Sequence, residues 1–187
     1  MREFETDPSS LAGSLLLAHP SLRDPNFMNT VVFLSMHNAE DGAFGMILNR
    51  PSGRRLNELM PDRDLGMLAM APVYLGGPVG QDQILMAAFR WDENAEVWQW
   101  RHDLTLESAP EILEDGQTVL RVFAGYSGWS KGQLERELRQ KTWVVHNPDQ
   151  TLLDPDAHDG DLWRVLVRSH GPVLRFLTDM PDDLGLN

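Results

Sequence analysis

The chain has 187 residues, of which 42% are hydrophobic and 24% are charged, so it carries enough apolar material for a folded core. Its 16 basic and 28 acidic residues give a net charge of −12, which disfavours direct binding to a nucleic-acid backbone. The absence of cysteine excludes disulfides, thiol nucleophiles and cysteine-ligated metal centres. We expect a single domain over residues 1–187, with residues 1–10 as a loose leader.

The sequence contains no apolar run of 18 residues, and its N-terminal segment lacks the basic start of a signal peptide. We therefore expect a cytoplasmic protein that does not cross a membrane. Arg50, Arg54 and Arg55 are the best candidate for a local basic patch, but solvated surface arginines are the favoured interpretation.

The first part of the chain has the pattern of strands joined by turns. Residues 13–18 form a short apolar run before His19-Pro20, and residues 30–36 are rich in β-branched and aromatic side chains. Residues 37–42 have the composition of a hairpin connection, after which residues 43–49 return as the antiparallel partner. Gly45 inside this second strand indicates a bulge or a close backbone approach.

The middle of the chain predicts shorter elements. They are a break at residues 50–53, a short helix around residues 56–60, a strand at residues 73–75 that stops at Gly76-Gly77, and a second hairpin formed by residues 84–90 and 97–100. Ser108 and Glu111 have the S-x-x-E spacing of a capping box, which predicts a helix from Ala109.

Residues 119–138 are the most distinctive stretch. Residues 119–124 are apolar at most positions and predict a central strand, and Gly125 and Gly128 then predict a turn. Ser130 and Gln133 have the S-x-x-Q spacing of a capping box, which predicts a helix start near Lys131. Glu137 and Lys141 stand four residues apart, so we expect them to form an ion pair on that helix.

The last part of the chain predicts a strand at residues 143–145, a polar loop at residues 147–160 and a helix at residues 161–169. Residues 173–177 fit either type of structure. Hairpins with a few helices between them predict an α+β fold with a mostly antiparallel sheet.

Four blocks of the sequence resemble the YqgE/AlgH family of bacterial proteins. They are residues 13–20 with 24–27, residues 30–51, residues 73–79 (VYLGGPV), and residues 125–138 (GYSGWSKGQLEREL) with Trp143; the closing residues 181–187 fit as well. The resemblance implies an α+β fold in which a bent, mostly antiparallel sheet forms a pseudo-barrel flanked by a few helices. Some members are labelled transcriptional regulators, but the resemblance implies no established reaction, and we predict no cofactor.

Known catalytic motifs fit the sequence poorly. Residues 125–129 (GYSGW) resemble a nucleophile elbow, but the second glycine stands one position early, so acyl hydrolysis at Ser127 is disfavoured. The acidic cluster at residues 154–161 fails the calcium-loop template, and we predict no metal site there. A solvated loop, with Asp159 or Asp161 as the cap of the following helix, is the favoured interpretation.

The leading hypothesis is a non-enzymatic binding or regulatory domain that acts through an unknown small ligand or protein partner. Its candidate site lies where strands end and comprises His19, Asn49, Arg50, Gly76, Gly77, Tyr126, Ser127, Trp129 and Gln133. One alternative is an enzyme of unrecognised type that uses His19 or Ser127. The other is a protein-interaction module whose contact face is the Trp-rich hairpin of Trp91, Trp98 and Trp100.

Overall fold

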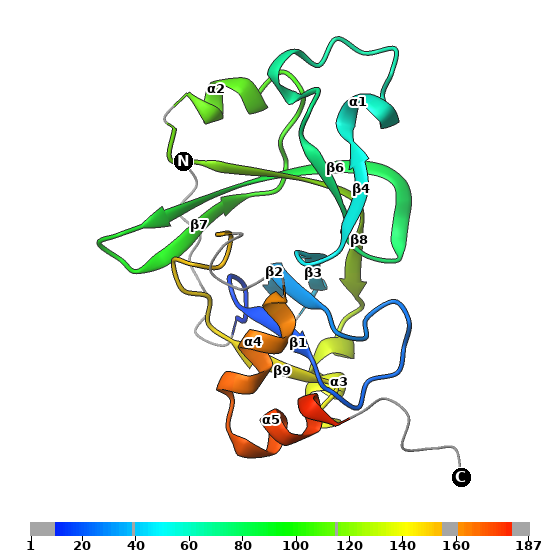
Figure 1. The fold of residues 1–187 in the computed structure, drawn as a ribbon, viewed down its shortest axis with the longest axis vertical. Helices are drawn as coiled ribbons and strands as arrows, with labels where there is room; N and C mark the ends of the chain where they lie inside the picture. The colour runs from blue at the N-terminus through cyan, green and yellow to red at the C-terminus, as the bar shows by residue number, and fades with distance from the viewer. Residues whose placement is uncertain (1–9, 39, 115, 155–160, 181–187) are drawn as a thin grey trace.

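A computed structural model describes residues 10–38, 40–114, 116–154 and 161–180. The predicted leader up to residue 9, most of the acidic cluster and the closing residues 181–187 lie outside the described residues. The chain forms a curled, half-barrel sheet with helices α1 and α2 at one end and α3, α4 and α5 at the other (Figure 1). The predicted α+β fold is confirmed.

Nine strands in the described part of the chain make one sheet. They are β1 (Leu15–Ala18), β2 (Val31–Asn38), β3 (Gly42–Ile47), β4 (Pro51–Arg55), β5 (Pro72–Leu75), β6 (Val79–Asp92), β7 (Val97–Arg101), β8 (Val119–Trp129) and β9 (Trp143–His146). The helical elements are α1 (Leu56–Leu59), the short η1 (Gly66–Leu68), α2 (Ala109–Leu113), α3 (Gln133–Arg139), α4 (Leu162–Ser169) and α5 (Pro172–Asp179). Both predicted hairpins are confirmed, as β2–β3 and β6–β7.

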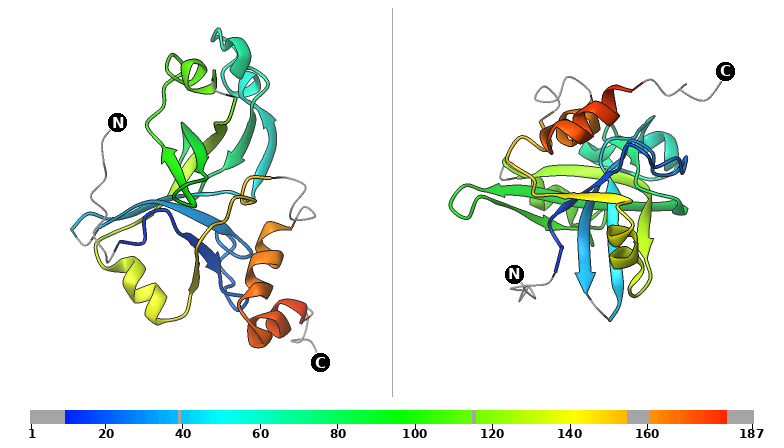
Figure 2. Two further views of the ribbon diagram at one scale, coloured as in Figure 1. Left: turned by 90° about the vertical axis from the view of Figure 1, so that its left-hand side faces the viewer. Right: turned by 90° about the horizontal axis from the view of Figure 1, so that it is seen from below.

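The strands follow the order β4-β5-β8-β3-β2-β1-β9, with β6 paired to β8 and β7 paired to β6. β5 and β8 run parallel, and every other pairing among the described residues is antiparallel. Figure 2 shows how the sheet curls, so that its two halves lie at an angle to each other. The sheet is therefore bent and mostly antiparallel, as predicted.

Strand β8 is the central strand, as its apolar sequence predicted. Val122 pairs with Val73 of β5 and also with Met86 of β6, so β5 and β6 lie on opposite edges of β8. Further along the chain, Ser127 pairs with Gly45 of β3. Because β5, β6 and β3 all pair with this one strand, β8 joins the two halves of the sheet.

The predicted turn at Gly125–Gly128 is wrong, because β8 continues to Trp129. Gly125 has a φ of +71°, which a glycine adopts at little cost, so the strand bends there instead of ending. The helix then begins at Gln133, two residues later than expected, because Gly132 occupies the cap position with a left-handed φ of +68°. Ser130 is not the cap, although its N–H and hydroxyl both donate to the Gln133 side chain.

The segment between β5 and β6 crosses over β8 in direct backbone contact. β5 ends on one edge of β8, where the Gly76 N–H donates to the Ala124 carbonyl at 2.9 Å. Val79 then pairs with Tyr126 in the ladder of the other edge. A Cβ atom on Gly76 would lie 2.2 Å from the carbonyl oxygen of Gly125, so only glycine fits at the crossing.

Three apolar clusters cover the two faces of the sheet. Val31 and Phe33 of β2 point to one face and contribute to the cluster beneath α4, whereas Val32 and Leu34 point to the other face, beneath α3. The third cluster lies between the β5–β8–β6 part of the sheet and helices α1 and α2. The predicted break after residue 49 is corrected in one respect, because residues 51–55 form the short edge strand β4.

The close backbone contact at the crossing predicts that a side chain at Gly76 destabilises the fold. Substitution of Gly76 by alanine is expected to lower the free energy of unfolding by about 1–3 kcal/mol, because the added methyl group meets backbone that cannot move aside. Gly128→Ala is the matched control, since its Cβ would meet only the Tyr126 ring at 3.3 Å; we expect a change within about 1 kcal/mol. Urea unfolding measures both, and equal stabilities of the two variants would contradict the crossing.

Candidate functional site

Asn49 and Arg50 bind the loop that precedes β2. The Asn49 side chain accepts the Val31 N–H at 2.8 Å and donates to the carbonyl of Asn29 at 2.9 Å. The Arg50 guanidinium donates to the carbonyls of Pro25, Asn26 and Met28 over 2.6–3.1 Å. Burial lowers the pKa of Arg50, while nearby Asp24 opposes that shift. Both side chains thus use their polar atoms in hydrogen bonds to backbone groups of the same chain.

Gly76, Gly77, Tyr126 and Ser127 meet at the crossing of β8. Ser127 is fully buried, and its hydroxyl donates to the Gly76 carbonyl at 3.1 Å. That carbonyl also accepts the N–H of Ile47 at 2.9 Å, which links β3 to the same point. The buried and bonded Ser127 hydroxyl cannot reach a substrate, so the enzyme hypothesis loses this nucleophile.

His19 lies at the end of β1, where its N–H donates to the Thr142 carbonyl at 2.9 Å. Its Nδ1 accepts the N–H of Ser21 at 3.2 Å and lies 2.8 Å from the Ser21 hydroxyl. Burial and the positive charge of Lys141 lower the pKa of His19. The ring therefore closes a local turn, with its Nδ1 already occupied.

Trp129 and Gln133 belong to a hydrogen-bond network centred on Glu137 of α3. One carboxylate oxygen of Glu137 accepts the indole N–H groups of Trp129 and Trp143 at 2.9 and 2.7 Å. The other oxygen accepts the Gln133 amide at 2.9 Å. Glu137 thus ties α3 to β8 and β9, and the expected Glu137–Lys141 ion pair does not form within the described residues.

The structure therefore divides the nine predicted residues into four places. Four meet at the crossing of β8, Asn49 and Arg50 bind the loop before β2, two lie in the Glu137 network, and His19 lies at the end of β1. That any of them contacts a ligand stays a prediction. The three arginines of the candidate basic patch also diverge: Arg54 binds Glu58, whereas Arg55 donates to the Met70 carbonyl at 2.9 Å.

The Trp-rich hairpin is not a free contact face. Trp98 is only 6% exposed, and its indole donates to the Asp149 carbonyl at 2.7 Å. Trp100 packs against the same core and donates to the Ser35 carbonyl at 3.1 Å. Trp98 is thus buried and Trp100 is partly buried, so these two rings do not form the open contact face that the interaction-module hypothesis predicted.

Sequence reasoning missed one pair of groups with catalytic potential. The Ser35 hydroxyl lies 2.6 Å from Nδ1 of His102, which is the distance of a nucleophile–base pair. Ser35 is only 5% exposed, however, and it sits at the bulge between Leu34 and Met36 of β2. The pair therefore joins β2 to the segment after β7, with its hydroxyl buried.

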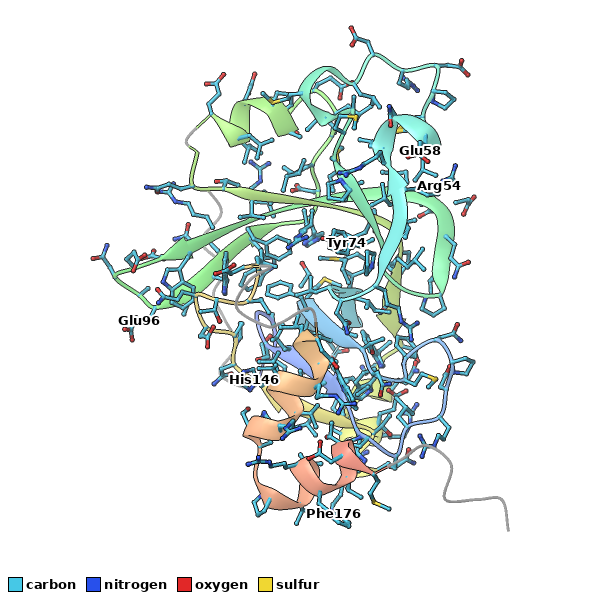
Figure 3. All side chains as sticks on the ribbon, viewed as in Figure 1. Arg54, Glu58, Tyr74, Glu96, His146 and Phe176 are labelled. Atoms are coloured by element: carbon cyan, nitrogen blue, oxygen red, sulfur yellow. The ribbon has the colours of Figure 1, made fainter. Side chains whose placement is uncertain are left out.

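A hollow of about 290 Å³ opens next to the crossing of β8. We call it the β4–β6 hollow; it is lined by Ser52, Arg54, Leu59, Val73, Leu75, Gln81, Asp82, Ile84 and Ala124. Its floor is one row of the sheet, because Ala124 of β8 pairs with Leu75 on one side and with Ile84 on the other. Arg54 projects from β4 on the rim (Figure 3), and Asp82 lies in the irregular start of β6.

The lining of the β4–β6 hollow includes close sequence neighbours of three predicted site residues, Arg50, Gly76 and Tyr126. Leu75 directly precedes Gly76, Ser52 follows Arg50 by two residues, and Ala124 precedes Tyr126 by two. Arg54, Asp82 and Ile84 were missed as site residues. Their signal in the sequence was slight, because residues 79–83 carry no regular pattern and β6 was expected to begin only at Ile84.

His146 and His170 form a second contact between titratable groups. Nδ1 of His146, which lies on β9 (Figure 3), is 2.9 Å from Nε2 of His170, the residue that caps the end of α4. Burial is the main reason that the pKa of His146 is lowered; the neighbouring His170 adds to the shift and Asp149 opposes it. The two rings hold the α4 end against the sheet only while one of them is neutral.

No helix in the described part of the chain is long and apolar enough to cross a membrane. No three histidine, aspartate or glutamate side chains within that part of the chain lie close enough together to hold a metal ion.

The Glu137 network predicts a large stability effect. Glu137→Leu is expected to lower the free energy of unfolding by about 2–4 kcal/mol, because two indole N–H groups lose their acceptor. Arg139→Leu on the exposed side of α3 is the control and should change stability by less than about 0.5 kcal/mol. Denaturant unfolding gives both values; a Glu137→Leu protein as stable as the parent would show that these bonds do not hold α3.

The histidine pair predicts a pH dependence of stability. Since the folded-state pKa of His146 lies below its unfolded value, the unfolded chain binds more protons, and acid favours unfolding. Stability is complete above about pH 6.5 and falls as the pH drops from there toward the folded pKa. His146→Gln should reduce this fall in melting temperature between pH 7.5 and 5.5, leaving the share of His19, whose pKa shifts in the same direction. An unchanged pH profile in the variant would refute the role of His146.

Comparison with known proteins places this fold in a family. The AlgH-like family profile matches residues 15–175. A UPF0301 protein of Thermobifida fusca is 36% identical over 99% of this chain and 100% of its own, and one of Streptomyces coelicolor is 38% identical over 97% and 98%. The solution structure of the AlgH protein from Pseudomonas aeruginosa superposes with a TM-score of 0.66 at 27% identity, covering 97% of this chain and 98% of the other. A crystal structure of a Corynebacterium diphtheriae protein gives 0.68 at 22% identity, over 96% and 95% of the two chains. The chain therefore belongs to the AlgH-like family.

Proposed function

We propose that this protein is a non-enzymatic binding domain whose ligand occupies the β4–β6 hollow. The observation that carries the proposal is the apolar floor of that hollow, which is exposed at Leu75 although it continues the buried core. Leu75 is 44% exposed, while Val73 beside it is 1% exposed and belongs to the cluster under α1 and α2. An exposed apolar side chain in a concave place lined by further apolar residues is a common basis of a small-molecule site.

The rim of the hollow defines what such a ligand must carry. Arg54 lies on the β4 side, where it also bonds to the carbonyl of Glu58, and Asp82 lies on the β6 side. The volume of about 290 Å³ is at the lower end for a small-molecule site. The ligand is therefore a small organic molecule with an apolar body and polar groups toward both rims.

The lining of this hollow supports binding in preference to catalysis. Its one hydroxyl nucleophile, Ser52, already donates to the Val73 carbonyl at 2.7 Å. No histidine among the described residues lines the hollow to act as its base. A bound ligand would thus be held without being transformed by a Ser–His mechanism.

Any role in transcription would be indirect under this proposal. The net charge of −12 repels a phosphate backbone, and the arginines that could offset it are engaged with carbonyls and with Glu58. Binding of a small ligand, or of a protein partner that responds to it, would carry the regulatory signal.

A thermal-shift screen against metabolites, nucleotides and other small organic compounds tests this proposal. At least one compound is expected to raise the melting temperature, because a ligand that binds only the folded state stabilises it. Leu75→Asp should remove that shift by placing a charge on the apolar floor. Val97→Asp is the matched control, since Val97 is a strand residue with a similar exposure of 50% outside the hollow. Ligand shifts that survive Leu75→Asp undiminished would place the site elsewhere.

A further inference from the structure

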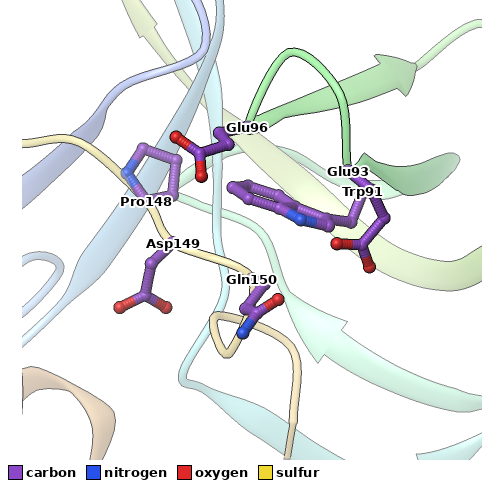
Figure 4. Close-up of a pocket in the computed structure, with 6 residues that line it drawn as sticks. All are labelled: Trp91, Glu93, Glu96, Pro148, Asp149 and Gln150. Atoms are coloured by element: carbon purple, nitrogen blue, oxygen red, sulfur yellow. The ribbon is translucent and has the colours of Figure 1, made fainter.

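A second hollow, of about 380 Å³, lies between the tip of the β6–β7 hairpin and the segment that follows β9. We call it the Trp91 hollow; its lining consists of Trp91, Glu93, Glu96, Pro148, Asp149 and Gln150. Figure 4 shows the indole ring of Trp91 flanked by the carboxylates of Glu93 and Glu96, with Pro148 and Gln150 completing the lining. It shares no residue with the β4–β6 hollow.

The two sides of the Trp91 hollow are held together by Trp98. The Trp91 ring packs edge-on against Trp98, with ring centroids 5.6 Å apart and an interplanar angle of 65°. The Trp98 indole in turn donates to the backbone carbonyl of Asp149, on the other side of the hollow, at 2.7 Å. The aromatic wall is therefore fixed in position, and its shape does not depend on a mobile surface side chain.

Trp91 also differs from the other tryptophans of the chain. Trp98, Trp100, Trp129, Trp143 and Trp163 each donate the indole N–H to a carbonyl or carboxylate. Trp91 makes no such bond to any residue within the described ranges. The position of the Trp91 ring in the hollow is therefore not explained by a hydrogen bond from its indole N–H within the described residues.

The charge of the hollow selects for a cation. Glu93 and Glu96 are exposed, and neither forms an ion pair within the part of the chain that is described. Asp149 adds a third carboxylate, and its Oδ1 accepts hydrogen bonds from the N–H and the hydroxyl of Thr151. These carboxylates do not form a cluster that could chelate a metal ion. A cation that is attracted by spread negative charge and also packs on an indole is an organic ammonium ion.

We propose that the Trp91 hollow binds a small organic ammonium ion, with the cationic head on the Trp91 ring and the carboxylates of Glu93, Glu96 and Asp149 around it. Ring quadrupole and carboxylates act together, because both attract the same positive charge. The acidic surface of the whole chain raises the local concentration of such cations.

Choline and tetramethylammonium are suitable probes, and 3,3-dimethyl-1-butanol is the uncharged isostere of choline. In a ¹H–¹⁵N spectrum of the full chain, the Trp91 indole signal is identified by its loss in Trp91→Phe. Both cations are expected to shift this signal in a saturable way that weakens as salt is added, whereas the alcohol should leave it unchanged. Calorimetry with choline should show binding weakened by roughly 2- to 30-fold in Trp91→Leu.

Glu96→Gln should also weaken choline binding, while Glu111→Gln, which makes the same charge change on α2 outside the hollow, should not. The folded state of each variant is checked by the other five indole signals, so a loss of binding is not mistaken for unfolding. Equal binding of choline and its uncharged isostere would overturn the proposal, as would a Trp91 signal that does not respond to either cation.

Discussion

The backbone crossing at Gly76 and Gly125 is the constraint on which the rest of the fold depends. β5 and β6 are consecutive in the chain but occupy opposite edges of β8, so the three residues between them must pass over that strand. The passage is possible because Gly76 and Gly77 have no Cβ atom. An added Cβ would lie 2.2 Å from the β8 backbone at Gly76 and 2.3 Å from it at Gly77. The same contact bends β8 at Gly125 and leaves room for β3 to pair beyond the bend, which produces the half-barrel.

Local patterns in the sequence predicted the elements whose cause is local. The β-branched run of β2, the hairpin compositions and the apolar stretch of β8 each determine a strand through their own residues. The pattern failed at residues 125–129, where glycine and serine are typical of a turn. What keeps that segment extended is its pairing with β3, about 80 residues earlier in the chain, and no local pattern reports such a partner.

The candidate site shows the same limit for side chains. The i,i+4 spacing of Glu137 and Lys141 predicted a surface ion pair. Instead, the Glu137 carboxylate accepts hydrogen bonds from two indole N–H groups, one on β8 and one on β9. Several of the residues predicted from strand ends meet at the crossing, yet most polar groups there form hydrogen bonds to buried backbone. The exposed surface begins at Leu75, one residue before Gly76, because alternation along a strand sends neighbouring residues to opposite faces.

The two proposed sites lie toward opposite ends of β6, and this placement bears on how they act. Ile84 lines one hollow and Trp91 the other, and seven strand residues span roughly 23 Å. Between them, β6 is paired with β8 on one edge and, from Ala88, with β7 on the other. A strand held this way does not change length or register when a ligand binds at one end. Occupation of the two hollows should thus be independent unless a ligand orders the hairpin tip or the segment at residues 80–83, where the pairing of β6 is interrupted. Because ligand binding at the two hollows is independent, residues of one hollow can be substituted without loss of binding at the other.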